Sequence, residues 1–276
     1  MTTKRAPRKP KEAQLTLTPE LAKKPRAPRK PKNEGPITLA IPPRVEGIDR
    51  WVIFGLDPSL SRTGYAVMHI TPGEDRSVAK WLEVGSIKPE DSSDPVWIRS
   101  KATALSLREK LRTVIEDHLK DEDFSRTGLI ISFEAPTPNN DFLTSISRIL
   151  HLILFEAGSS TDRFAQTHVQ MTNAATMRRL MGLVQRGNSN KKENVARAYT
   201  FLDQGSYPNL DTDACDAVLM SMMARYTAAI LMGFSHTLPE RFLIALCNAE
   251  VETVGKPPLR IQGPPTSGGI DLQAQK

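Results

Sequence analysis

The chain has 276 residues, 39% of them hydrophobic, and a formal net charge of +6 at pH 7. This much apolar material is enough for a folded core, which excludes wholesale disorder, and two cysteines are too few for a disulfide framework or a cysteine-based zinc site. Because no segment has the pattern of a membrane span or a secretion signal, we expect an intracellular, cytoplasmic protein without membrane contact.

Residues 1–48 are expected to form a basic arm. They hold 12 of the 37 Lys and Arg residues and 4 of the 31 acidic residues, so their net charge is +8 and that of the remainder is −2. The segment at 5–11 recurs without change at 26–32, and its alternating prolines and cations favour neither helix nor sheet. We expect four cations of the repeat to contact phosphates: Arg8, Lys9, Arg29 and Lys30. A nuclear-import signal and a solubilising tail are the alternatives.

A folded domain is predicted over residues 49–236, and it begins with strands. Apolar runs separated by turn residues predict strands at Trp51–Asp57, Thr63–Ile70 and Lys80–Ile87. The gaps between them are short, which predicts an antiparallel meander of three strands.

Helices and strands alternate in the rest of this domain. Apolar spacing predicts helices at about 96–120, 140–157, 173–181, 191–203 and 213–232, and apolar runs predict strands at Leu129–Glu134 and Ala165–Gln170. The fold class is therefore α/β, with a mixed five-stranded sheet and helices on both faces. For residues 237–276 we expect a short helix and a flexible tail.

Four acidic residues stand at the ends of these elements. Asp57 and Glu134 each end a strand, and Asp213 and Asp216 share one face at the start of the last helix. Mg²⁺ prefers carboxylate ligands, and two divalent ions roughly 4 Å apart can activate water and hold the leaving oxygen of a phosphodiester. Each acid alone could be a turn or capping residue, which is the role we assign to Asp211. As a set they predict a site for two Mg²⁺ ions, with Mn²⁺ able to replace them.

Four motifs in this order resemble those of RuvC-type Holliday junction resolvases, which are RNase H-like nucleases. They are Gly55-Leu56-Asp57-Pro58-Ser59, Ser132-Phe133-Glu134, Asn190-Lys191-Lys192-Glu193-Asn194-Val195 and Asp213-Ala214-Cys215-Asp216. The resemblance implies a Mg²⁺-dependent homodimer that nicks four-way DNA junctions in pairs, with no organic cofactor. It also implies a lysine beside the scissile phosphate, for which we prefer Lys192 and keep Lys191 as the alternative. The loop after Glu134 departs from the family, because Ala135-Pro136 stands where a Gln is usual, and this leaves junction selectivity open.

Further cations and one apolar helix complete the expected site. Arg178, Arg179 and Arg186 lie on and after a basic helix and suit contacts with the DNA backbone, or belong to a solvated face. The helix at 140–157 is apolar nearly all round, which indicates either core packing or a dimer interface around Ile146, Ile149, Leu150 and Ile153. A nuclease for forks, flaps or RNA–DNA hybrids, a catalytically silent DNA-binding protein and a sugar-kinase-like ATPase are the rival functions.

Overall fold

The computed structural model shows how the predicted elements assemble. It describes residues 44–59, 61–88, 94–135, 144–146, 149, 163–183, 191–203, 205–239, 242–243, 250–253 and 259–260. The predicted basic arm therefore lies outside the described residues as far as residue 43.

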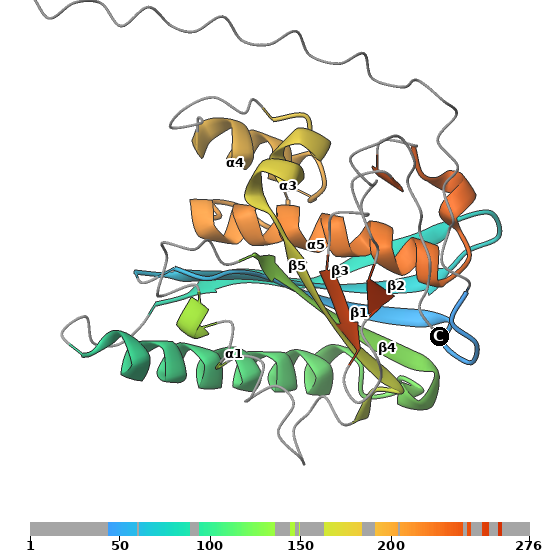
Figure 1. Ribbon diagram of the computed structural model, residues 1–276, viewed down its shortest axis with the longest axis horizontal. Helices are drawn as coiled ribbons and strands as arrows, with labels where there is room; N and C mark the ends of the chain where they lie inside the picture. Colours follow the sequence, from blue (N-terminus) through green and yellow to red (C-terminus); the bar gives the residue numbers. More distant parts are fainter. Residues whose placement is uncertain are drawn as a thin grey trace, which may run out of the picture. The chain divides into compact units, whose positions relative to one another are not determined.

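A mixed sheet organises the fold (Figure 1). The five predicted strands are β1 (Arg50–Asp57), β2 (Thr63–Pro72), β3 (Ser77–Ile87), β4 (Thr127–Glu134) and β5 (Gln166–Thr172). The first three form the expected antiparallel meander, and β4 and β5 run parallel to β1 in the order β3-β2-β1-β4-β5. β1 and β4 have almost continuously buried residues because both of their faces are covered by helices.

The sheet has seven strands where the sequence predicted five. The additional strands are β6 (Glu250–Thr253), which pairs antiparallel with β5, and β7 (Leu259–Arg260), which pairs with β6. They are four and two residues long and lie in the region 237–276, for which a short helix and a flexible tail were predicted. Such short segments have no apolar alternation of their own, so pairing with the edge of β5 defines them.

Helices cover both faces of the sheet, as predicted (Figure 1). The helix α1 (Val96–His118) packs on one face, and α3 (Ala174–Leu180), α4 (Lys191–Tyr199) and α5 (Thr212–Leu231) lie on the other. Each face has its own apolar core, one built around α1 and one around α5.

The helix α5 lies unusually close to the sheet. A Cβ on Gly55 of β1 would be 2.7 Å from both the Ala217 oxygen and the Ser221 nitrogen of α5, so only glycine fits there. The Ser221 hydroxyl donates a hydrogen bond to the Ala66 oxygen of β2 at 3.0 Å, which holds the helix in register. By length and composition α5 could cross a membrane, although we had expected no segment of the chain to have that pattern. Most of α5 is buried in this core, and core packing accounts for its apolar character.

The folded unit includes residues on the N-terminal side of the predicted boundary at residue 49. Ile48 is 5% exposed and belongs to the core around α5, and the Val45 nitrogen donates a hydrogen bond to the Leu231 oxygen at the end of that helix. An arm that can be removed without disturbing packed residues therefore ends at about residue 43.

The predicted apolar helix at 140–157 is described only in part. Residues 144–146 and 149 are helical, Ile146 is fully buried in the core around α1, and Ile149 packs partly buried against that core. At Ile146 the structure thus agrees with core packing, the first of the two alternatives, and Ile146 is not available for a dimer surface. Leu150 and Ile153 lie outside the described residues.

Candidate active site

Two of the predicted carboxylates end neighbouring strands. In the parallel pairing of β1 and β4, Leu56 lies opposite Phe133. The next residue along each strand is Asp57 and Glu134, respectively, so both acids stand at the same end of the sheet. The pairing of two parallel strands thus brings together carboxylates that are far apart in the sequence.

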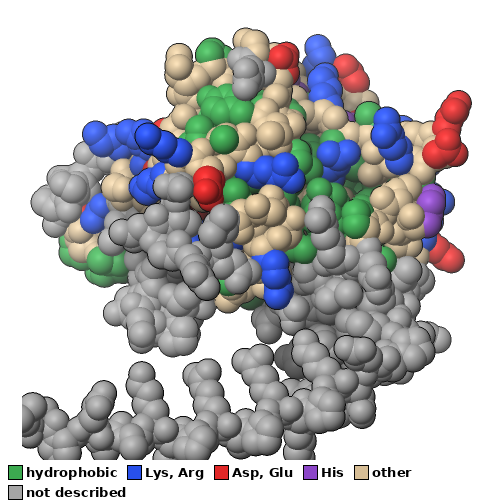
Figure 2. Space-filling view, turned by 90° about the horizontal axis from the view of Figure 1, so that it is seen from above, with side chains coloured by type: hydrophobic (Ala, Val, Ile, Leu, Met, Phe, Trp, Pro, Cys, Tyr) green, Lys and Arg blue, Asp and Glu red, His purple; other side chains and the backbone are tan. Residues whose placement is uncertain are grey.

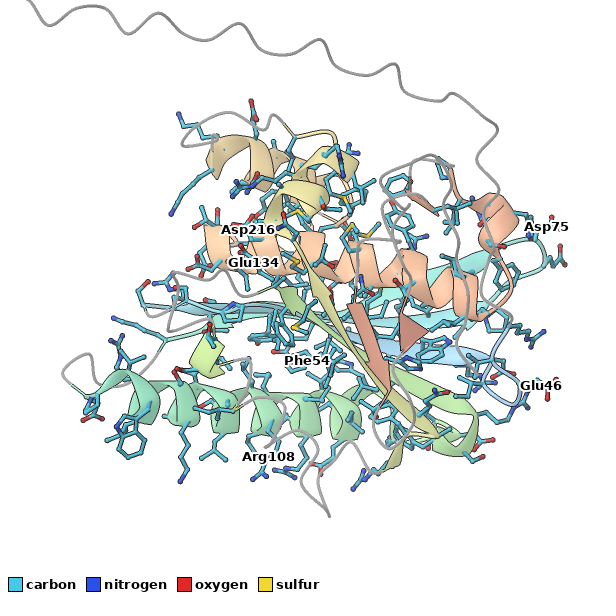
Figure 3. The ribbon with its side chains drawn as sticks, viewed as in Figure 1. Glu46, Phe54, Asp75, Arg108, Glu134 and Asp216 are labelled. Atoms are coloured by element: carbon cyan, nitrogen blue, oxygen red, sulfur yellow. The ribbon has the colours of Figure 1, made fainter. Side chains whose placement is uncertain are left out.

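The start of α5 lies over the same end of the sheet. Gly64 pairs with Asp57 in the register of β1 and β2, and a Cβ on Gly64 would overlap the backbone of Asp213. Asp216 is one turn further along α5, and Figure 3 shows it beside Glu134. All four predicted carboxylates therefore come from three elements that meet at one place.

Burial and mutual repulsion dominate the electrostatics of these acids. Burial, reinforced by the negative charges of Asp216, Glu134 and Asp213, raises the pKa of Asp57 well above its ordinary value. Burial also raises the pKa values of Glu134, Asp213 and Asp216. Within the described residues, Asp57, Glu134 and Asp213 form no hydrogen bond or ion pair that would compensate for this burial.

Arg178 is the cation most closely associated with this cluster. Its charge acts against burial and lowers the pKa values of Asp57, Glu134 and Asp216. It is partly buried, because it lies on α3 between Met177 and Leu180, which face the core. The neighbouring Arg179 is exposed, which fits both alternatives given for it, a DNA contact and a solvated face, and Arg186 lies outside the described residues.

The two lysines at the start of α4 differ in their relation to the acids. Both are exposed, but only the charge of Lys191 contributes to the pKa values of Asp213 and Asp216, which it lowers against the larger effect of burial. Lys192, which we preferred because of the resemblance to RuvC-type motifs, makes no such contribution. On the face that carries α3 and α4, Lys and Arg side chains predominate over acidic ones in the described part of the surface (Figure 2). This side of the molecule suits a polyanion.

The carboxylate cluster has the chemistry of a site for a hard divalent cation. Its donors are all carboxylate oxygens, and their raised pKa values show that added positive charge would stabilise the ionised forms. In the described part of the chain no three Asp, Glu, His or Cys side chains are yet close enough to hold one ion. Binding of one cation by three of these side chains would therefore require the carboxylates to move closer together.

Asp211 caps α5 and takes no part in the cluster. One carboxylate oxygen accepts a hydrogen bond from the Ala214 nitrogen at 2.8 Å. The other accepts from the Arg62 guanidinium at 2.9 Å and from the Ser86 hydroxyl at 2.6 Å. Burial raises the pKa of Asp211, but these three hydrogen bonds together outweigh burial and lower the pKa below its ordinary value. The capping role predicted from the sequence agrees with this geometry, whereas Arg62 and Ser86 had not been singled out.

Because its oxygens are already engaged, Asp211 is not expected to replace Asp213. We expect Asp211→Ala to lower the free energy of unfolding by about 1–2 kcal/mol through loss of the cap, with the half-exposed ion pair to Arg62 adding little. Asp211→Asn should lower it less, since Asn is also a good cap. Urea unfolding followed by circular dichroism measures both. A stable Asp211→Ala protein that no longer binds Mn²⁺ would instead make Asp211 a ligand.

The sequence was compared with known families and structures. No family model matches it, and no curated protein matches it. The fold is similar to the structure of Thermus thermophilus RuvC (15% identity over 66% of this chain and 97% of that chain, TM-score 0.42). It is also similar to T. thermophilus RuvC in complex with a Holliday junction substrate (14%, 66% and 97%, TM-score 0.42) and to the Mn-soaked human cytomegalovirus terminase nuclease domain (14%, 71% and 86%, TM-score 0.32). By its own strand order, its mixed pairing and the helices on both faces, the chain has an RNase H-like fold.

Proposed function

We propose that this protein is a divalent-metal-dependent endonuclease that cleaves branched DNA. The observation that carries the proposal is the convergence of Asp57, Glu134, Asp213 and Asp216 at one end of the sheet, with raised pKa values and almost no compensating partners. A structural role would pair such partly buried acids, since an uncompensated charge away from water is costly. A binding site for cations explains why Asp57, Glu134 and Asp213 have no such partner among the described residues.

The residues of the site divide into two groups. The four carboxylates would hold Mg²⁺, most simply two ions, and Mn²⁺ would replace it. When bound, such cations activate water for attack on phosphorus and stabilise the leaving oxygen. Lys191 and Lys192 at the start of α4 would contact the phosphate, and Arg178 would offset the negative charge that substrate brings into the site. Arg179 and Arg186 would bind the backbone of the DNA further out.

Four-way junctions are the substrate we favour. The four motifs that contain the carboxylates and the lysine pair resemble those of RuvC-type resolvases, in the same order along the chain. The departure at Ala135-Pro136 follows Glu134 directly and is the place where substrate choice would differ from that family. A nuclease for forks, flaps or RNA–DNA hybrids is the alternative, and it would use the same carboxylates.

A homodimer would explain paired cleavage. A four-way junction has near two-fold symmetry, and a dimer with a self-complementary interface supplies two sites in matching orientation. Since Ile146 belongs to the core, the position to test is Ile149, which is only partly buried against that core, and the variant is Ile149→Glu. Light scattering coupled to gel filtration should give a dimer for the wild type and a folded monomer for the variant, which nicks junctions singly. A wild-type monomer that makes paired cuts would contradict the dimer.

The proposed activity is tested with labelled DNA of defined shape. We expect the full-length protein to cut four-way junctions in Mg²⁺ or Mn²⁺, to cut three-way junctions and linear duplex more slowly, and to be inactive in EDTA. If the protein instead prefers forks, flaps or RNA–DNA hybrids, the assignment of the metal site stands and the proposed substrate is wrong. Binding of junctions without cleavage in either metal would make the protein a silent DNA-binding protein of this fold.

A further inference from the structure

One side chain outside the acidic set is bonded directly to it. Asn194 of α4 donates a hydrogen bond from its Nδ2 to the Oδ1 of Asp216 on α5, at 2.7 Å across 22 residues of sequence. Asn194 is 4% exposed and is buried together with Ala198 on the core-facing side of α4, whereas the first two residues of this helix are exposed lysines. A buried amide in such a helix calls for an explanation beyond apolar packing.

The direction of this bond follows from chemistry. An ionised carboxylate only accepts hydrogen bonds, so the amide nitrogen of Asn194 has to face Asp216. The amide oxygen, Oδ1, then points elsewhere, and it is buried with no hydrogen-bond partner in the described part of the chain. An unsatisfied buried acceptor of this kind costs free energy that a donor, such as cation-bound water, would recover.

We propose that Asn194 is a positioning residue that fixes the orientation of Asp216 for cation binding and links it to the lysine pair on α4. The proposal rests on the proposed function, because it concerns the same site. By occupying one oxygen of Asp216, Asn194 leaves the other for the cation. Lys191 is three residues earlier, one helical turn away, so it lies on the same side of α4 as Asn194. Asn194 therefore connects the helix that carries the lysine pair directly to Asp216.

The test compares the affinity of DNA-free, full-length protein for Mn²⁺, measured by electron paramagnetic resonance of the free ion. Asn194→Ala removes the donor, and Asn194→Leu removes it while keeping nearly the same side-chain shape. Thr200→Ala is the matched control, because Thr200 is exposed directly after the same helix, where its hydroxyl donates a hydrogen bond to the Arg197 oxygen. We expect both Asn194 variants to bind Mn²⁺ about 10–100-fold more weakly than the wild type, and Thr200→Ala to bind it normally.

Turnover provides the second measurement. Loss of orientation at Asp216 should lower kcat for junction cleavage by a similar factor while KM for DNA stays near the wild-type value, since the lysines are intact. A Leu variant that is folded and binds Mn²⁺ within twofold of the wild type would overturn the proposal and leave the nuclease assignment standing. A wild-type protein that binds no Mn²⁺ would instead remove the nuclease assignment, and this inference with it.

Discussion

Replacing Asp57 by Asn is expected to abolish metal-dependent cleavage and, in the same protein, to raise the thermal stability measured in EDTA. Loss of a ligand removes cation stabilisation of the transition state, which is worth several kcal/mol and corresponds to a rate lower by roughly 10³-fold or more. The gain in stability has the same structural cause, which is the proximity of the four carboxylates. Asp57 is partly buried near Glu134, Asp213 and Asp216, and an amide in its place carries no charge to repel them.

The pH dependence of this gain has a defined sign. Folding raises the pKa of Asp57, so the folded state binds a proton more tightly than the unfolded chain does. The stabilisation by this proton is complete below the unfolded pKa of about 3.9 and is lost as the pH rises through the higher folded pKa. The Asp57→Asn variant has no titrating group at this position, so its stability does not fall in this way as the pH rises. The difference in midpoint between Asp57→Asn and the wild type should therefore be small in acid and grow toward neutral pH.

Circular dichroism melts in EDTA between acid and neutral pH measure this difference. Each kcal/mol of stability shifts the midpoint by roughly 2–4 °C in a domain of this size. Asp75→Asn is the control, because Asp75 is an exposed turn residue far from the cluster (Figure 3). Saturating Mg²⁺ should raise the midpoint of the wild type and leave that of Asp57→Asn almost unchanged, since only a competent site gains from the ligand. Near-normal cleavage by Asp57→Asn, or a lower midpoint in EDTA, would remove Asp57 from the site.

The five central strands, the meander of the first three and the candidate acidic set were predictable because their signals are local, whereas the strand order came from the structure. Five apolar runs predicted β1 to β5, and the lengths of the gaps between them predicted which pairs are antiparallel. Acids at two strand ends meet whenever those strands are parallel neighbours, so the pairing of β1 with β4 was enough to bring Asp57 to Glu134.

Finer features of the site depend on contacts that no local pattern encodes. Arg62 and Asp211 are 149 residues apart, and the sequence of neither predicts their ion pair. Adjacent residues of a helix point about 100° apart, so the rotation of the helix about its axis determines which of two neighbouring cations faces the acids. Arg178 approaches them and Arg179 does not, and Lys191 differs from Lys192 in the same way. The phase is fixed by how α3 and α4 dock on the core, which is a tertiary property. For the same reason Asn194 was given no role of its own, although it belongs to one of the four motifs.

Deleting residues 1–43 is expected to weaken junction binding and to flatten its salt dependence, while metal-dependent cleavage persists at low salt. The deletion removes 11 Lys and Arg residues and 3 acidic residues. It stops short of Val45 and Ile48, which pack against the folded domain, so it should not lower the unfolding midpoint. Four cations of the repeat are the expected phosphate contacts: Arg8, Lys9, Arg29 and Lys30.

The salt slope distinguishes a DNA-binding arm from the alternatives. Each phosphate contact contributes about 0.9 to the slope of log affinity against log salt concentration, so replacing these four cations by Gln should reduce the slope by roughly 3 to 4. Fluorescence anisotropy with a labelled junction in EDTA, between 50 and 200 mM salt, measures it without cleavage. An arm with the same residues in scrambled order is the control, because contacts made by charge alone survive scrambling whereas a specific import signal does not. If the slope of the Gln variant equals that of the wild type, the repeat binds no phosphate, and its positive charge serves a partner other than DNA.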